Sequence, residues 1–271
     1  MRFVKNMTIG VFALALAILV ILPFAATAQQ DGIILYWPLD GKDVNVAKDH
    51  SGNGKDGGLF GGAERVPGKY GSGVYLDGVD DYIEIANQLT EAGTIEFWFK
   101  PDWDGGDGED YRLFDASTGA IYFFISKGAD HADIVPTNFG FYFEDVTDAD
   151  WQDIIFDPAG VINAGEWYHI AATWEFGVGG LAFLYVNGEE AATSPKILGG
   201  FPPLDANMRF GLKGVVYVAS KNGAEGVMDE IAVYNRALTP EEIAEDMEKL
   251  LLPVEPLDKA TSTWGNIKAT Y

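Results

Sequence analysis

The residues with the clearest chemical potential lie in two short segments far apart in the sequence, 49–54 (Asp-His-Ser-Gly-Asn-Gly) and 226–231 (Gly-Val-Met-Asp-Glu-Ile). A sandwich of β-sheets that brings its first and last strands together would place Asp49 beside Asp229. Two carboxylates with nearby loop carbonyls require a cation, and oxygen ligands suit a hard ion such as Ca²⁺. In the alternative interpretation, Asp49 only caps the turn that follows it and Asp229 only pairs with a neighbouring strand.

Paired carboxylates could also hydrolyse a glycosidic bond, which in retaining enzymes takes two carboxyls about 5 Å apart. The only adjacent acids on one expected strand are Asp229 and Glu230, and neighbouring side chains of a strand point to opposite faces. Glu84 and Glu96 stand alone on their strands. The sequence therefore favours a non-catalytic protein, with a glycan-active hydrolase as a lesser alternative.

The sequence supports nucleophilic or metal-dependent catalysis even less than it supports glycoside hydrolysis. The chain has no cysteine and no Gly-x-Ser-x-Gly segment, and its three histidines lack the spacing of a zinc site. His169 lies in an apolar strand and is expected to pack in the core, whereas His50 and His131 are expected at the surface. The acidic loop 102–110 invites a second calcium site, but Gly106 breaks the calcium-loop pattern, so we expect a solvated loop tip.

The first residues predict an export signal. Arg2 and Lys5 precede an apolar stretch from Ile9 to Phe24, and the small residues at 26–28 form a cleavage pattern. Residues 1–28 are therefore predicted to be removed, which leaves a secreted or cell-envelope protein with no membrane insertion; a retained signal anchor is the alternative. The net charge of −23 argues against nucleic-acid and anionic-membrane partners.

The rest of the chain reads as an all-β domain. Residues 94–101 alternate cleanly, with Ile95, Phe97 and Phe99 on one side and polar residues on the other. Asn187 and Gly188 predict a tight hairpin turn with positive φ at both positions. One short helix is expected after the strands, because Thr239 can cap it and Pro240 suits its first position. It is expected to run to about Leu251.

Several motifs occur in the order of a known family: 36–40 (Tyr-Trp-Pro-Leu-Asp), 49–54, 68–71 with 76–82, 165–171 (Gly-Glu-Trp-Tyr-His-Ile-Ala), 184–188, and 228–238. Together they resemble the laminin-G-like, concanavalin-A-like jelly-roll domains over roughly Gly32 to Met247. The resemblance implies a two-sheet antiparallel jelly-roll sandwich over residues 29–252, followed by a C-terminal tail at 253–271. It also implies a structural calcium, with Asp49, Asn53 and Asp229 as ligands and Asp40 as a weaker fourth.

Tryptophans that no core needs could form platforms for sugar stacking. Trp103 and Trp151 lie among acidic residues in stretches without a strand period, and Trp98 lies on the polar side of its strand. The alternative is that the two loop tryptophans fold back over the edge of the sandwich. We therefore expect a calcium-stabilised, non-catalytic module that binds an extracellular glycan or glycosylated surface. The second hypothesis is a structural or adhesive cell-envelope protein with protein partners.

Overall fold

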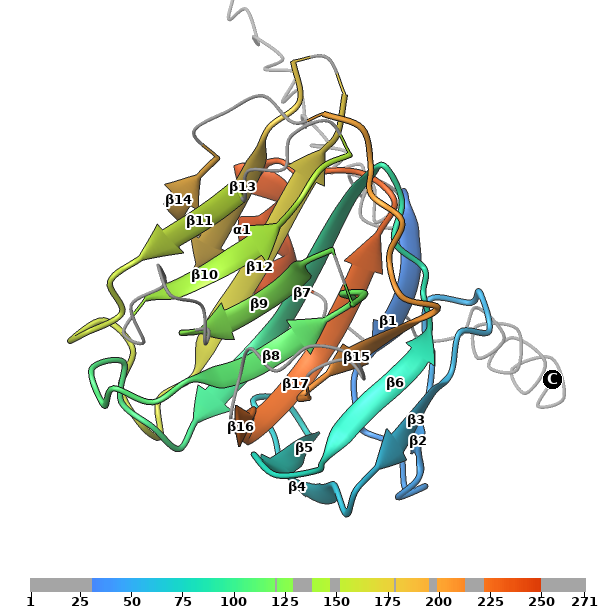
Figure 1. Ribbon diagram of the computed structural model, residues 1–271. Helices are drawn as coiled ribbons and strands as arrows, with labels where there is room; N and C mark the ends of the chain where they lie inside the picture. Colours follow the sequence, from blue (N-terminus) through green and yellow to red (C-terminus); the bar gives the residue numbers. More distant parts are fainter. Residues whose placement is uncertain are drawn as a thin grey trace, which may run out of the picture.

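The computed structural model describes residues 31–119, 121–128, 138–146, 152–177, 179–194, 199–212 and 222–249. Trp151, His131, the predicted signal at 1–28 and the predicted tail at 253–271 lie outside these ranges. The described residues form two β-sheets stacked face to face with one helix, which confirms the predicted sandwich (Figure 1). Within the described residues, no helix has both the length and the apolar character needed to cross a membrane.

The first sheet has eight strands in the order β14-β13-β12-β7-β17-β5-β4, with β1 beside β17. Its strands are β1 (Ile33–Trp37), β4 (Glu64–Pro67), β5 (Ser72–Asp77), β7 (Ala92–Pro101), β12 (Tyr168–Glu175), β13 (Ala182–Val186), β14 (Glu189–Thr193) and β17 (Glu225–Tyr234). The pairing of β1 with β17 brings the first and last described strands together, with Trp37 opposite Ile231. This is the pairing that the sequence analysis required.

The second sheet has nine strands in the order β11-β10-β9-β8-β15-β6-β3-β2, with the short β16 beside β8. Its strands are β2 (Val46–Ala47), β3 (Gly57–Phe60), β6 (Tyr82–Ala86), β8 (Tyr111–Asp115), β9 (Phe123–Lys127), β10 (Phe139–Phe143), β11 (Gln152–Phe156), β15 (Asn207–Phe210) and β16 (Asn222–Gly223). The pairing of β16 with β8 is parallel, whereas every other described pair is antiparallel.

Aromatic side chains join the two sheets. Trp174 of the first sheet meets Phe123 of the second with ring centroids 5.2 Å apart, and its indole nitrogen donates to the carbonyl of Thr90 at 2.9 Å. Gly93 must remain glycine, since a Cβ there would come within 2.3 Å of the Trp174 ring. Because the chain has no cysteine, this packed core holds the sheets together without disulfides.

The outer face of the first sheet is covered by helix α1 (Pro240–Lys249), which lies behind the sheets in Figure 1. Ile243 of α1 packs against Ala171, Tyr185 and Ala232. The predicted cap is confirmed: the hydroxyl of Thr239 accepts from the amide of Glu242, and the Glu242 carboxylate accepts from the amide of Thr239. The helix therefore begins where the sequence predicts.

Candidate functional site

The predicted calcium ligand Asp49 is occupied by hydrogen bonds. Its carboxylate accepts from the amides of Tyr36, Ser51 and Lys55 at 2.9–3.0 Å, and from the Ser51 hydroxyl at 2.9 Å. Burial works to raise the pKa of Asp49, but these donors outweigh it and the pKa lies below its ordinary value. Asp49 thus fixes its own loop against β1, the role that the turn-capping interpretation assigns to it.

Asn53 fixes the same loop. Its side-chain amide donates to the carbonyls of Ile33 and Ile34 at 2.9 and 3.0 Å. Both Asp49 and Asn53 therefore hold the segment 49–55 to the first strand, through contacts that need no ion.

The other two predicted ligands, Asp229 and Asp40, hold the loop between β4 and β5. Asp229 accepts from the amide of Tyr70 at 3.0 Å, and Asp40 accepts from the amide of Ser72 at 2.8 Å. The loop passes so close that a Cβ on Gly68 would come within 2.4 Å of the Asp229 carboxylate. The structure therefore gives Asp49 and Asp229 different partners on different segments.

Asp229 and Glu230 lie at an irregularity of β17, whereas the expectation that they face opposite sides assumed regular alternation. Glu230 has φ +53° at an irregularity of β17, and its carboxylate accepts from the hydroxyl of Tyr36. Burial, with a contribution from Asp40, raises the pKa of Asp229 to about 7. Burial and the charge of Asp229 raise the pKa of Glu230 to about 8. Strand alternation failed here because a bulge interrupts it.

A different group of acids has metal-like geometry. In the described part of the chain, the three carboxylates whose oxygens lie within 4.8 Å of one another belong to Asp77, Asp80 and Asp81. They occupy the turn between β5 and β6, where Asp77 accepts from the amide of Val79 at 2.8 Å. Burial, then the charges of Asp77 and Asp80, raise the pKa of Asp81. Three acids in five residues around Gly78 were the available sequence signal.

The acidic loop 102–110 already has a cation. The ammonium of the buried Lys127 contacts the carboxylate of Asp107 and donates to the carbonyl of Glu109 at 2.6 Å. The same ammonium lies 5.6 Å from the ring centre of Trp103. A lysine thus supplies the positive charge that a second calcium would have supplied. Residues 106–109 are exposed, as the predicted solvated loop tip requires.

The predicted aromatic platforms have protein neighbours. Trp103 is only 4% exposed and stacks on Tyr111 with centroids 4.8 Å apart, as expected of a loop that folds back onto the core. Trp98 is 8% exposed, and the ammonium of Lys69 lies 4.0 Å from its ring centre. The most exposed aromatic ring on either sheet is instead Phe60, at 44%, stacked on Tyr82 at 4.9 Å.

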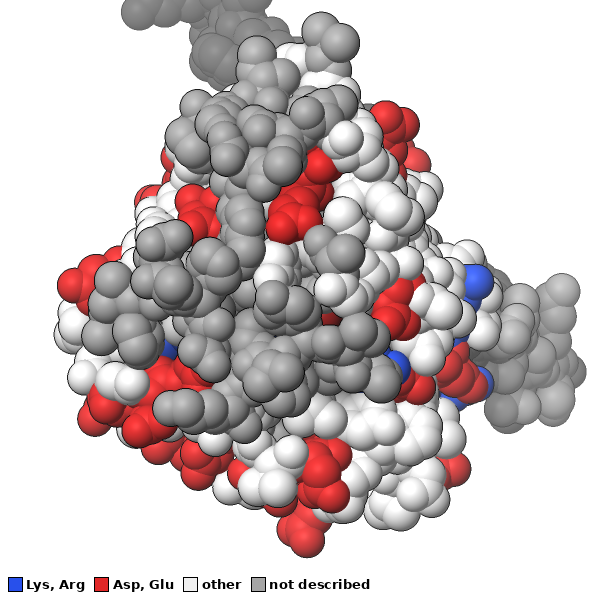
Figure 2. Space-filling model, viewed as in Figure 1, with Lys and Arg blue, Asp and Glu red and all other residues white. Residues whose placement is uncertain are grey.

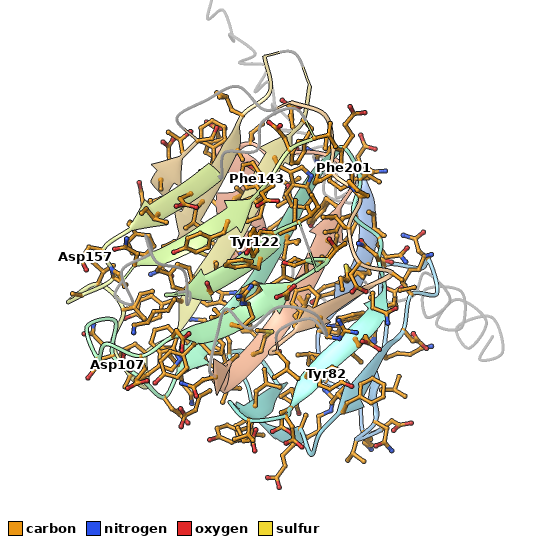
Figure 3. All side chains as sticks on the ribbon, viewed as in Figure 1. Tyr82, Asp107, Tyr122, Phe143, Asp157 and Phe201 are labelled. Carbon is orange, nitrogen blue, oxygen red and sulfur yellow. The ribbon has the colours of Figure 1, made fainter. Side chains whose placement is uncertain are left out.

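The outer face of the second sheet carries a continuous line of polar and aromatic side chains, which we call the transverse row. Strand register aligns one residue from each of seven strands across this face: Gly58, Glu84, Arg209, Asp115, Phe124, Tyr142 and Asp153. Figure 3 shows Tyr122 over the middle of this face and Tyr82 on β6 near its lower end. The row depends on the register between strands that are distant in the sequence, so no local sequence motif predicts it.

Ion pairs and stacking give the transverse row a fixed geometry. Arg209 contacts Glu84 at 2.6 Å, and the neighbouring Arg112 contacts Asp115 at 2.9 Å. The Arg112 guanidinium also lies 3.4 Å from the ring centre of Phe124, which stacks on Tyr142 at 4.9 Å. The row thus alternates charged pairs with aromatic faces.

The hydroxyl of Tyr142 and Nη1 of Arg209 are shielded from solvent and lack a hydrogen-bond partner among the described residues. Leaving such buried groups unpaired costs about 1–3 kcal/mol each. The middle of the row is therefore covered, and exposed aromatic surface lies toward Phe60, which stacks on Tyr82.

Comparison with known proteins places the fold in a family. Residues 77–244 match the family model described as the concanavalin A-like lectin/glucanases superfamily. A search of curated proteins finds no match to the sequence.

Solved structures share the fold at low identity. The botulinum neurotoxin serotype D binding domain is 19% identical with a TM-score of 0.61, over 81% of this chain and 52% of that one. The binding domain of Paraclostridial Mosquitocidal Protein 1 is 21% identical with a TM-score of 0.62, over 82% and 53%. Domain 4 of AbnA, an extracellular arabinanase from Geobacillus stearothermophilus, in complex with arabinotriose, is 19% identical with a TM-score of 0.58, over 80% and 98%. This chain thus spans about half of the two toxin binding domains and nearly all of the arabinanase domain.

Proposed function

Because the chain belongs to the concanavalin A-like lectin/glucanases superfamily, we propose that it is a secreted, non-catalytic module that binds extracellular carbohydrate or a glycosylated surface. The binding face in this proposal is the outer face of the second sheet. The similar solved structures include toxin binding domains and a domain bound to arabinotriose, which supports a binding role.

The observation that carries the proposal is the exposed ring of Phe60, which is 44% exposed and stacks on Tyr82 with centroids 4.9 Å apart on this face. Sugars present C–H surfaces to aromatic rings, so this stacked pair offers a platform for one sugar ring.

Charge favours a neutral glycan over a nucleic acid or an acidic lipid. The two arginines of the face, Arg112 and Arg209, are each paired with a carboxylate. Figure 2 shows acidic side chains spread over the described surface in this view, with few basic ones between them. An anionic ligand would meet repulsion over most of this surface.

Substitution of Phe60 by alanine tests the exposed aromatic platform. Because Phe60 lies at the surface, Phe60→Ala is expected to leave the stability of the fold close to that of the wild-type protein. If the ring stacks against a sugar, the affinity for that sugar falls by roughly tenfold, or about 1.4 kcal/mol. A glycan array identifies the ligand, and titration calorimetry with denaturant unfolding measures the two effects.

Val161→Ala, which shortens an exposed apolar side chain elsewhere on the surface, is the matched control, and Trp98→Phe tests the platform predicted from the sequence. A glycan that binds Phe60→Ala and wild-type protein equally, but not Trp98→Phe, would move the binding site to the first sheet. Release of reducing sugar would contradict the non-catalytic role, and Glu144, whose pKa burial raises, would be the first acid to replace.

A structural calcium remains part of the proposal, although the predicted ligand set does not fit it well. Asp40, Asp49 and Asp229 do not form a convergent trio in the described structure, and Asp49 already accepts four hydrogen bonds. The turn acids Asp77, Asp80 and Asp81 offer the better set of oxygen donors. Bound there, the ion would neutralise the turn between β5 and β6.

Calcium is expected to raise the melting temperature by roughly 5–10 °C over the value in chelator, as for a ligand at about 100 times its Kd. Asp80→Asn abolishes this difference if the ion binds in the turn, whereas Asp229→Ala abolishes it if the predicted ligands bind the ion. Calorimetric scans of the three proteins with and without calcium decide between them. Identical melting of the wild-type protein in both conditions would rule out a stabilising calcium.

A further inference from the structure

A cavity of about 290 Å³ lies on the side of the molecule opposite the transverse row, between helix α1 and the outer face of the first sheet. Its floor includes the rings of Phe183 and Tyr185, whose centroids are 6.1 Å apart. Thr173 contributes a buried hydroxyl-bearing side chain between β7 and β13. The floor therefore offers aromatic faces with one polar group.

Acidic side chains stand at the rim of this cavity. Glu175 and Glu190 both line it and both are exposed. The described lining includes no Lys or Arg. Aromatic faces with carboxylates at their edge are the arrangement that recognises a positive charge, by cation–π attraction and ion pairing together.

The amino end of α1 does not reverse this charge. Thr239 and Pro240 line the cavity, and a bare helix N-terminus would repel a cation. Here the first turn carries Glu241 and Glu242, and Glu242 closes the cap on Thr239. The nearby guanidinium of Arg236 is paired with Glu242 at 2.8 Å.

The negative charges around the cavity also act on Tyr185 in its floor. Burial is the main cause of its raised pKa, and the charges of Glu190 and Glu241 add to it. Carboxylates from β14 and from α1 thus both act on a ring in the cavity floor. Strand β14 and helix α1 therefore both contribute negative charge to this cavity.

We infer that this cavity is a second binding site, which receives a single alkylammonium or guanidinium group over the Phe183 and Tyr185 rings between Glu175 and Glu190. The volume is just below that of ordinary small-molecule sites and suits one such side-chain-sized group. The group can belong to a small free amine or to a lysine or arginine displayed by another protein. The site is separate from the proposed glycan-binding face, so each can fail without the other.

The test titrates the mature protein with N-acetyl-lysine-methylamide and N-acetyl-arginine-methylamide, using the neutral N-acetyl-norleucine-methylamide as the matched probe. Ring resonances of Phe183 and Tyr185 are followed by NMR. The cationic probes are expected to shift them with Kd values in the millimolar range, and binding weakens as salt is added. Equal shifts with the norleucine probe, or no shifts with any probe, would overturn the inference.

Two variants locate the binding. The double substitution E175Q/E190Q is expected to weaken binding of the cationic probes at least tenfold, and Phe183→Leu to weaken it severalfold. E64Q/E166Q removes two exposed acids elsewhere and should bind as wild type does. If the control weakens binding as much as E175Q/E190Q, the probes respond only to overall charge and the inference fails.

A final titration with putrescine distinguishes the sources of the cation. Tighter binding of putrescine than of the capped residues supports a free amine, whereas the reverse order supports a side chain presented by a protein. Shifts confined to Phe183 and Tyr185 are required in both cases.

Discussion

Replacing Arg112 with methionine is expected to destabilise the protein by about 3–5 kcal/mol, the usual cost of leaving one member of a buried ion pair without its partner. Arg112 and Asp115 are both buried, 2.9 Å apart, in the middle of the second sheet. The same guanidinium lies against Phe124, so the substitution also removes a cation–π contact. Denaturant unfolding of the variant and the wild-type protein measures the difference.

The double variant R112M/D115N isolates the ion pair. Asparagine retains an oxygen for the amide of Ser117, which Asp115 accepts at 2.7 Å, but it removes the orphaned charge. We expect the double variant to recover a large part of the lost stability, because replacing both members of a buried pair is often nearly neutral. If R112M alone unfolds at wild-type denaturant concentrations, the buried pair contributes nothing to the stability of the fold.

Local chemistry in the sequence was enough to predict several of the elements, although β3 and β11 fall in segments that were expected to be loops. Asn187 and Gly188 both have positive φ, at +53° and +79°, as the predicted hairpin turn requires. Ile95, Phe97 and Phe99 all lie in the core, as their alternation predicts. These outcomes depend on residues within a few positions of one another, so a pattern in the sequence is sufficient to read them.

The residues of the candidate site could mostly not be predicted from such local patterns. The transverse row exists because seven strands from distant parts of the chain adopt one particular register. Likewise, the partners of Asp49 and Asp229 depend on which backbone amides each loop brings to them. The order of the motifs predicted that the first and last strands are paired. It did not predict which atoms of the two strands and their loops contact one another.

The other large effect concerns pH and the buried His169. Its ring lies 5.3 Å from that of Trp98, with Nε2 3.7 Å from a carboxylate oxygen of Glu96 on the next strand. Burial lowers the pKa of His169 to about 3, and burial raises the pKa of Glu96, which also faces Asp246 of α1. At neutral pH His169 is therefore uncharged, and its contact with Glu96 is not an ion pair.

The sign of the pH effect follows from proton binding. Between pH 6.5 and pH 3 the unfolded chain binds a proton at this histidine and the folded chain does not, so stability falls as the pH falls. From pH 7 to pH 4 the loss amounts to about 3 kcal/mol for this residue alone. Glu96 contributes with the opposite sign, because a carboxyl with a raised pKa loses stability as the pH rises.

His169→Gln isolates the histidine from these opposing contributions. The difference in unfolding free energy between wild type and variant is expected to stay constant above pH 7 and to shift by about 3 kcal/mol in favour of the variant by pH 4. The exposed His50, replaced in the same way, should give curves parallel to wild type. Parallel curves for His169→Gln as well would mean that the folded protein protonates His169 as readily as the unfolded chain does. His169 could then pair as a cation with Glu96 beneath α1, instead of remaining a neutral imidazole.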